Sequence, residues 1–226
     1  MRRAIVLATF GARWAAPISG LSRQPEMGAL PGPMALRPVF SQMRLVSNSK
    51  LAAATLSEME DEQQRSERPE KPEMPASWTL DRKIGETFFT MRRTYEDEEI
   101  VLQYTGECEK NGVATHTFIV FVVCKNKGLV FNMSVEEGEI VLNNVCFRQD
   151  AKLAMDSAAE SQAKNDLLYG GPDVADLEDS LVEAFASYLE ERGVNDDLGN
   201  FIERYSYWAE QAEYEEWLGN INKFVS

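Results

Sequence analysis

The chain has 226 residues, and its 23 Lys and Arg against 37 Asp and Glu give a formal charge of −14 that is unevenly spread. Residues 1–46 carry six basic residues and one acidic residue, so residues 47–226 hold 17 basic against 36 acidic residues, a net −19. A body this acidic disfavours direct binding of nucleic acid, because phosphate neutralisation needs clustered Lys and Arg, and it favours basic partners.

Few residues are available for a metal or redox site. The single histidine, His116, excludes zinc motifs that need several histidines, and the three widely spaced cysteines form neither a zinc ribbon nor a disulfide framework. No run of about 18 apolar residues occurs, so we expect no transmembrane segment. We expect no metal site and no bound cofactor.

Residues 1–46 have the composition of a targeting segment. They contain Arg, Ser, Ala and Leu, no Lys, and a single acid, Glu26, which is typical of a mitochondrial transit peptide. A secretory signal is the alternative, because Arg2 and Arg3 precede an apolar stretch, but that stretch is short and no small-residue cleavage site follows it. The composition therefore predicts a presequence over 1–46, removed close to Ser47, and a single mature domain over 47–226.

The mature domain begins with a predicted helix over 47–68. This segment has good helix formers, no Gly or Pro, and a thin apolar stripe that requires a docking partner. Pro69, Pro72 and Pro75 end the helix and form a short stiff linker.

From Trp78 the hydrophobic period changes to two, which predicts an antiparallel sheet over 78–169. Turn residues such as Asn111-Gly112 and Lys127-Gly128 separate the strands. Residues 117–124 are almost continuously apolar and predict a central strand covered on both faces. Residues 150–166 predict a flexible excursion, and 167–169 a last short strand. The expected strands are 78–82, 86–93, 98–106, 115–126, 129–135 and 139–147, followed by 167–169.

Residues 173–226 predict two helices. The first ends before Gly193, which suits a position after a helix C-terminus, and Asn195 or Asp196 can cap the second. The second helix is apolar on two sides, so we expect it to contact two neighbours, one of which can be a second subunit; a purely intrachain core is the alternative. The residues expected at helix packing or subunit contacts are Phe201, Tyr205, Tyr207, Trp208, Trp217 and Phe224.

The sequence contains no convincing catalytic motif. No glycine-rich phosphate loop occurs, and Cys108 with His116 lacks a third group to orient a nucleophile pair. His116 begins a predicted strand and is expected to be an ordinary surface residue. The charge is more informative, because residues 173–226 alone have a net −11. The acids expected to contribute to partner binding are Glu96, Asp97, Glu98, Glu99, Glu136 and Glu137.

The C-terminal third carries a family resemblance. The segments 168–172 (LYGGP) and 187–195 (SYLEERGVN), with the later positions Tyr214, Trp217 and Leu218, resemble the mitochondrial acidic matrix protein family, also called the mitochondrial glycoprotein family. The resemblance implies an α+β fold, in which a twisted seven-stranded antiparallel sheet is flanked by one N-terminal and two C-terminal helices. It also implies a doughnut-shaped homotrimer.

The same resemblance implies a function. Members are similar to non-enzymatic adaptors or chaperones of the mitochondrial matrix that bind basic proteins, RNA-binding or ribosomal, and contact RNA only indirectly. They support mitochondrial gene expression, through RNA processing, RNA editing or translation, and hence oxidative phosphorylation. An acidic cation-binding or storage protein is the alternative, and an enzyme is disfavoured by the missing motifs.

Overall fold

The computed structural model describes residues 40–226 except 111 and 137, and residues 40–226 form one compact unit. The predicted presequence over 1–46 falls mostly outside the described residues. The elements in chain order are α1 (Phe40–Gln64), β1 (Thr79–Asp81), β2 (Thr90–Tyr95), β3 (Glu98–Lys110), β4 (Val113–Cys124), β5 (Lys127–Glu136), β6 (Glu139–Arg148), α2 (Ala151–Met155), α3 (Ala159–Asp166), the 3₁₀ turn η1 (Val174–Asp176), α4 (Asp179–Glu191) and α5 (Asp196–Val225).

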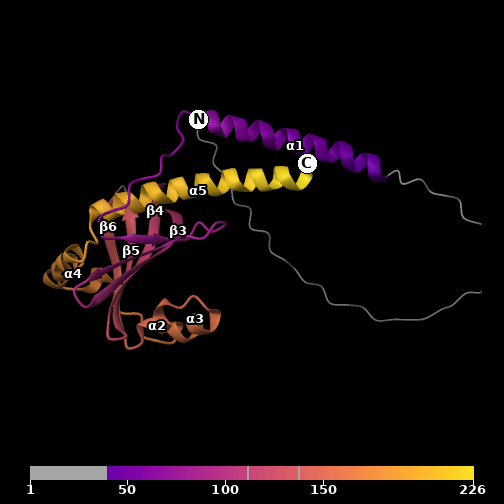
Figure 1. Cartoon of the computed structure of the whole chain (residues 1–226). Helices are drawn as coiled ribbons and strands as arrows, with labels where there is room; N and C mark the ends of the chain where they lie inside the picture. Colours follow the sequence, from indigo (N-terminus) through magenta and orange to yellow (C-terminus); the bar gives the residue numbers. More distant parts are fainter. Residues whose placement is uncertain (1–39, 111, 137) are drawn as a thin grey trace, which may run out of the picture. The chain divides into compact units, whose positions relative to one another are not determined.

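The six strands form one antiparallel sheet in sequential order, as the alternating pattern predicts. Each strand pairs with the next; a loop of residues 82–89 joins β1 to β2, and the later connections are short. At the turn between β4 and β5, Lys125 and Asn126 both have positive φ, the conformation that matches the twist of a two-residue hairpin. Figure 1 shows α5 running beside the sheet, with α1 next to it. The chain is therefore an α+β protein built on an antiparallel meander.

The two faces of the sheet are covered unequally. The main core lies between one face and the helices α4 and α5, and it includes Phe118, Val120 and Phe131 from the strands with Ile202 from α5. Each of these side chains is almost fully buried, which contributes roughly 1.5–3 kcal/mol apiece by removal of apolar surface from water. On the other face a smaller cluster around Phe121 is covered by α2. The central strand β4 thus has apolar cover on both faces, as predicted.

The seventh strand implied by the resemblance is not present in the described residues. Residues 167–169, the segment expected to form a last strand, lie in an exposed loop after α3, with Leu167 88% and Tyr169 79% accessible. Only an isolated bridge between Asn144 and Asp173 adds to the edge of β6. Residues 150–166, expected to be a flexible excursion, instead form α2 and α3. The Asp150 carboxylate accepts a hydrogen bond from the Leu153 amide and caps α2.

The helix boundaries follow local signals in the sequence. Gly193 has φ +74°, and a Cβ at that position would collide with the Arg93 guanidinium, so a glycine is required where α4 ends. The Asn195 side chain accepts from the Leu198 amide at 3.2 Å and caps α5. Both features confirm the predicted ends of the C-terminal helices.

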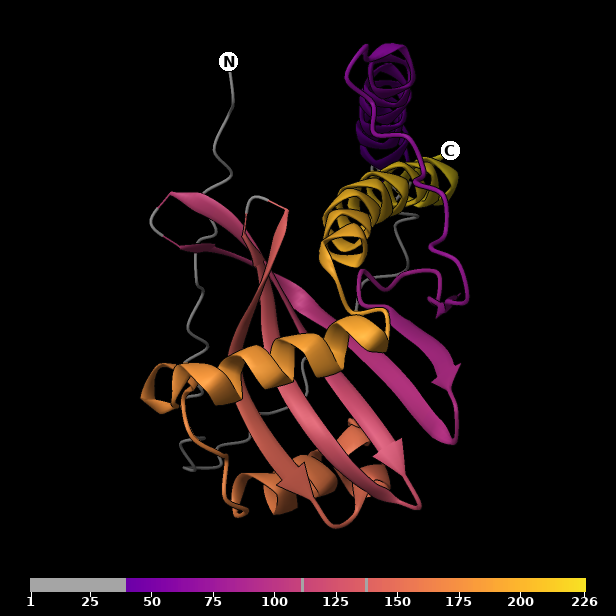
Figure 2. The same cartoon turned by 90° about the vertical axis from the view of Figure 1, so that its left-hand side faces the viewer.

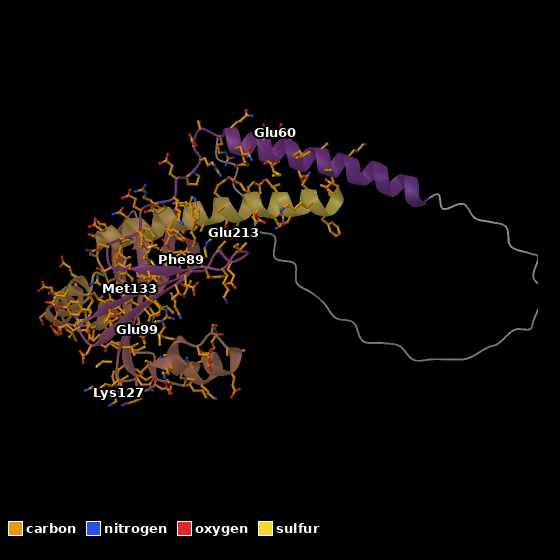
Figure 3. The ribbon with its side chains drawn as sticks, in the orientation of Figure 1. Glu60, Phe89, Glu99, Lys127, Met133 and Glu213 are labelled. Carbon is orange, nitrogen blue, oxygen red and sulfur yellow. The ribbon has the colours of Figure 1, made fainter. Side chains whose placement is uncertain are left out.

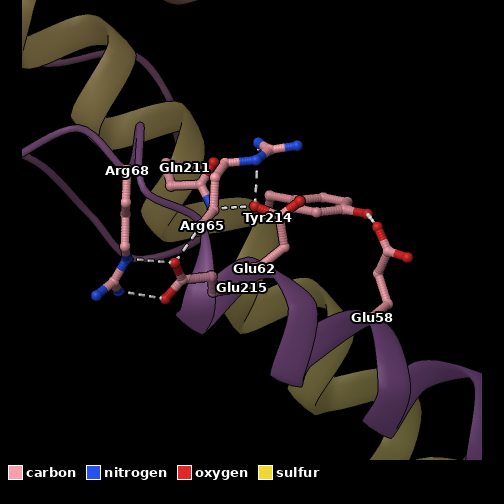
Figure 4. A network of polar contacts seen from close by, with 7 residues as sticks. All are labelled: Glu58, Glu62, Arg65, Arg68, Gln211, Tyr214 and Glu215. Atoms are coloured by element: carbon pink, nitrogen blue, oxygen red, sulfur yellow. Dashed lines mark hydrogen bonds and ion pairs between the residues drawn. The ribbon is translucent and has the colours of Figure 1, made fainter.

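The helix α1 docks on α5 largely through polar contacts (Figure 4). Arg68 makes two bonds to the Glu215 carboxylate, at 2.9 and 2.6 Å, and Gln211 Nε2 donates to Glu62 at 2.9 Å. The Tyr214 hydroxyl donates to Glu58 at 3.0 Å. Glu58 and Glu62 therefore tie α1 to α5, and Glu215 holds Arg68 just beyond the end of α1, so these acids contribute less to the free negative charge of the surface.

His116 is buried, contrary to the expectation of a surface residue. It is 1% exposed, and its Nδ1 lies 3.2 Å from both the Tyr104 hydroxyl and the Ser206 hydroxyl. The reason is alternation: β4 begins at Val113, so His116 falls on the same face as Phe118, beneath α5. Burial raises the pKa of Tyr104 to about 12, so its hydroxyl stays protonated near neutral pH.

The burial of His116 predicts a pH dependence of stability. Burial lowers the pKa of His116, although the nearby Glu203 carboxylate opposes this shift. In the unfolded chain the pKa is about 6.5. Above about pH 6.5 the imidazole is neutral in both the folded and the unfolded chain. Below about pH 6.5 the unfolded chain takes up the proton first. The free energy of unfolding therefore falls as the pH decreases towards the lower pKa of the folded state.

We expect His116→Gln to flatten the fall in unfolding free energy between pH 7 and 5.5, measured by urea denaturation. The chain has no other histidine, so a difference between the two proteins in this range belongs to His116. Parallel pH profiles for the wild type and the variant would show that the residue is not held neutral in the fold.

Candidate interaction surface

Nine exposed carboxylates lie on α4, in the segment just before it and in the first turn of α5. We call this set the α4 acidic surface. Its nine members are Asp173, Asp176, Glu178, Asp179, Glu183, Glu190, Glu191, Asp196 and Asp197, all exposed. The only basic residue between 173 and 203 is Arg192, and it is buried. This stretch of the chain therefore contributes nine exposed acids and no exposed basic residue.

The position of the surface follows from the amphipathic pattern of α4. Figure 2 shows α4 lying across the strands, and its aromatic residues Phe185 and Tyr188 contact Phe131 of β5. Packing on the sheet turns the charged positions of the helix towards solvent. Asp179 begins α4, and Asp196 lies in the first turn of α5, where the helix dipole offsets part of their repulsion.

Arg192 makes its shortest contacts with the interior of the protein, and its Nη1 also lies 3.7 Å from the exposed Glu191 carboxylate. Its Nε donates to Glu98 at 2.7 Å, its guanidinium lies 3.3 Å from the centre of the Tyr188 ring, and the Tyr188 hydroxyl donates to the same carboxylate at 3.2 Å. Burial by itself lowers the pKa of Arg192, but the bond to Glu98 and the electrostatic attraction of Tyr188, Glu98 and Tyr95 together raise the pKa above its ordinary value. The positive charge of Arg192 is thus neutralised by Glu98.

The sequence-predicted acids fall into separate places. Glu96 and Asp97 are exposed in the turn between β2 and β3, whereas Glu98 is bound by Arg192 and Glu99 pairs with Arg92 at 2.8 Å. Glu136 ends β5, and Glu137 lies outside the described residues.

The structure does not bring these acids together. Glu99 pairs with Val123 and Glu136 with Thr115, so about 26 Å of β4 separates the two groups along the strand. None of the nine acids of the α4 acidic surface was among the acids predicted to bind partners, although the net charge of 173–226 pointed to the region.

Other acids also act within the fold. Glu213, labelled in Figure 3, accepts from Arg82 at 2.7 Å and from the Gly85 amide at 2.9 Å, and so ties the loop after β1 to α5. The α1 residue Glu60, also labelled there, is exposed. The free acidic charge is therefore smaller than the sequence count and is concentrated on particular elements.

The residues predicted at helix contacts divide into two groups. Phe201 and Tyr205 are buried against the sheet, and Trp208 is half-buried beneath Arg82. Tyr207, Trp217 and Phe224 are 40%, 55% and 90% exposed in the single chain. Trp217 and Phe224 line a cavity of about 510 Å³ together with Ile84 and Ile221. The distal end of α5 therefore presents an uncovered apolar surface.

Three further observations bear on chemistry. Across the described residues no three His, Cys, Asp or Glu side chains gather in a way that could hold a metal ion. Cys108, Cys124 and Cys146 are free thiols. No helix in the described part of the chain combines the length and apolar character needed to cross a bilayer.

The inward direction of Arg192 predicts two different mutational costs. Arg192→Ala leaves the poorly exposed Glu98 carboxylate without its partner and should lower the unfolding free energy by about 3 kcal/mol. Arg92→Ala removes a pair whose members are 50% and 51% exposed and should cost less than about 1 kcal/mol. Urea denaturation measures both, and equal losses would contradict the structural role of Arg192.

Comparison with known proteins agrees with this architecture. A family model described as mitochondrial glycoprotein (MAM33) matches residues 109–225. The chain is 28% identical over 138 residues to mitochondrial acidic protein mam33 of Schizosaccharomyces pombe, covering 58% of this chain and 51% of that protein. It is 29% identical over 109 residues to a mitochondrial protein of Arabidopsis thaliana, covering 47% and 40%. The matches thus span about half the length or less of these curated relatives.

Two solved structures match more completely. The crystal structure of the Trypanosoma brucei p22 protein superimposes with a TM-score of 0.77 at 61% identity, over 80% of this chain and 100% of that one. A Leishmania major protein, a sequence homologue of human p32, gives a TM-score of 0.73 at 42% identity, over 80% and 99%. The family model covers half of the sequence, and the fold agrees with these structures. The chain belongs to the mitochondrial glycoprotein family.

Proposed function

We propose that this protein is a non-enzymatic adaptor of the mitochondrial matrix that binds basic proteins through the α4 acidic surface. The observation that supports it best is the set of nine exposed carboxylates on and around α4, whose only basic neighbour in the sequence, Arg192, is directed inward. Carboxylates placed in this way attract Lys- and Arg-rich segments and speed their encounter with the protein.

The proposed partners are RNA-binding or ribosomal proteins, which the resemblance implies. Their RNA would be reached only indirectly, because a body of net −19 repels phosphate. Through such partners the protein would support mitochondrial gene expression, by RNA processing, RNA editing or translation, which is the role that the family resemblance implies. The predicted acids Glu96, Asp97 and Glu136 are proposed as secondary contributors.

The proposal predicts that binding of a lysine homopolymer weakens steeply from low to physiological ionic strength, because salt screens exposed charges within about 8–10 Å. Replacing three acids together, as Asp179→Asn, Glu183→Gln and Glu190→Gln, should weaken binding and reduce its dependence on salt. Isothermal titration calorimetry measures both quantities.

The matched control carries Glu60→Gln, Asp61→Asn and Glu67→Gln, which remove three exposed acids near the end of α1 and beyond it. Equal weakening by both triple variants would mean that the overall charge acts and that the α4 acidic surface has no special part. Salt-insensitive binding of the homopolymer, or tight binding of an RNA oligonucleotide alone, would overturn the proposal.

A cation-binding or storage role is the alternative, and calcium titration of the full chain separates the two. Stoichiometric, saturable uptake of Ca²⁺ at micromolar concentration would favour storage.

We further propose that residues 1–46 are removed on import and that the mature chain forms a homotrimer. The exposed Trp217 and Phe224 on α5 support a subunit contact. Native mass spectrometry of the protein isolated from mitochondria should show a trimer of subunits that lack residues 1–46. A retained Met1 would contradict the presequence, and a monomer at micromolar concentration would contradict the assembly.

A further inference from the structure

An apolar groove lies beside α4, at the end of β6. Its cavity measures about 690 Å³. Residues from β5, β6, α2, the loop after α3 and α4 line it. The main apolar contributors are Leu129, Phe147, Leu153, Leu168, Pro172 and Phe185. We call this cavity the α4 groove. It is separate from the apolar surface at the distal end of α5, which is lined by Trp217 and Phe224.

The apolar side of α4 is incompletely covered at this groove. Among the residues of α4 only Leu189 is fully buried, and Phe185, the residue of α4 that lines the groove, is half-buried. On the opposite wall Phe147 is 52% and Tyr169 79% exposed. A contiguous apolar surface of this kind on a folded protein usually marks a site of interaction.

Hydrogen bonds hold the walls of the groove in place. Arg148 Nη1 donates a hydrogen bond to the carbonyl oxygen of Tyr169 at 2.7 Å. Asn144 Nδ2 donates to the carbonyl oxygen of Pro172, also at 2.7 Å. Gly171 packs so closely on β6 that a Cβ there would meet the carbonyl oxygen of Val145. The loop after α3 is thus fixed against the edge of the sheet, and a partner would not have to order it.

The charges around the groove select the kind of partner. At a rise of 1.5 Å per residue, Asp179, Glu183 and Glu190 begin within about 9 Å of Phe185 along α4. That distance is comparable to the screening length at physiological salt, so these carboxylates act on anything seated in the groove. Arg148 is the one basic side chain in the lining, and its Nη1 is bonded to main-chain carbonyl oxygens.

We infer that the α4 groove receives a bulky apolar side chain from a basic, amphipathic segment of a partner protein, whose Lys and Arg residues lie against the α4 acidic surface. This inference rests on the proposed function and specifies its partner. Charge alone would attract any basic chain; an apolar anchor adds affinity that salt does not screen and restricts binding to segments with the matching pattern.

Two synthetic peptides test the inference on the full-length protein. Both are lysine-rich helices; one carries leucines at positions i, i+3 and i+7, and the other carries alanines there. The leucine peptide should bind at least about tenfold more tightly than the alanine peptide, because burial of one large apolar side chain raises the affinity by about that factor. The advantage should persist at high salt, where the alanine peptide loses affinity. Calorimetry provides both affinities.

Substitutions locate the site. The double variant Phe147→Ser and Tyr169→Ser should lower the affinity for the leucine peptide to that of the alanine peptide and leave the alanine peptide unaffected. Phe88→Ser is the matched control, because Phe88 is 56% exposed but lies outside the groove, and it should change neither. A photoreactive leucine at the anchor position should crosslink the wild-type protein within 147–172 or on α4, which tests the site without any variant.

The outcomes separate the two proposals. Equal affinities for the two peptides, an unchanged leucine affinity in the double variant, or crosslinks elsewhere would overturn the groove as a docking site. The adaptor proposal would still stand if removal of the α4 acids weakened both peptides. If neither peptide binds at low salt, both proposals fail. A change in subunit number in the double variant, seen by light scattering, would assign the groove to a contact between copies of this chain and also overturn the inference.

Discussion

The ion pair between Arg192 and Glu98 determines how the acidic surface of this protein is exposed. Arg192 is the only basic residue between 173 and 203, and its guanidinium bonds to a carboxylate at the start of β3 and stacks on Tyr188. The pair anchors the end of α4 to the sheet and engages the only basic residue of this stretch, whose other ion pair, with the exposed Glu191, is longer at 3.7 Å. Stability of the fold and charge of the surface therefore depend on the same contact.

Much of the fold could be predicted because its signals are local. Alternation from Trp78 onwards predicted all six strands, and Gly193 with Asn195 fixed the ends of the last two helices. The misassigned segments depend on tertiary context. Residues 167–169 look like a strand but do not pair with the edge strand β6, where the only added bridge joins Asn144 to Asp173. His116 is buried by α5, whose Ser206 lies 90 residues later in the chain.

The candidate site was less predictable for the same reason. The net charge of 173–226 indicated the region, yet the sequence could not distinguish free acids from bound ones. Glu98 is neutralised by a residue 94 positions away, and Glu215 by one 147 positions away. The groove beside α4 combines β5, β6, α2, a loop and α4, so no single stretch of sequence carries a signal for it.

Carboxyl-group footprinting tests most directly whether the α4 acidic surface is where basic partners bind. The full-length protein is labelled with a carbodiimide and an amine, with and without a bound lysine homopolymer, and labelling is quantified by mass spectrometry. The account predicts that the partner shields Asp179, Glu183 and Glu190, while the exposed Glu60 and Asp61 of α1 remain reactive. Shielding spread evenly over both helices, or confined to α1, would contradict it.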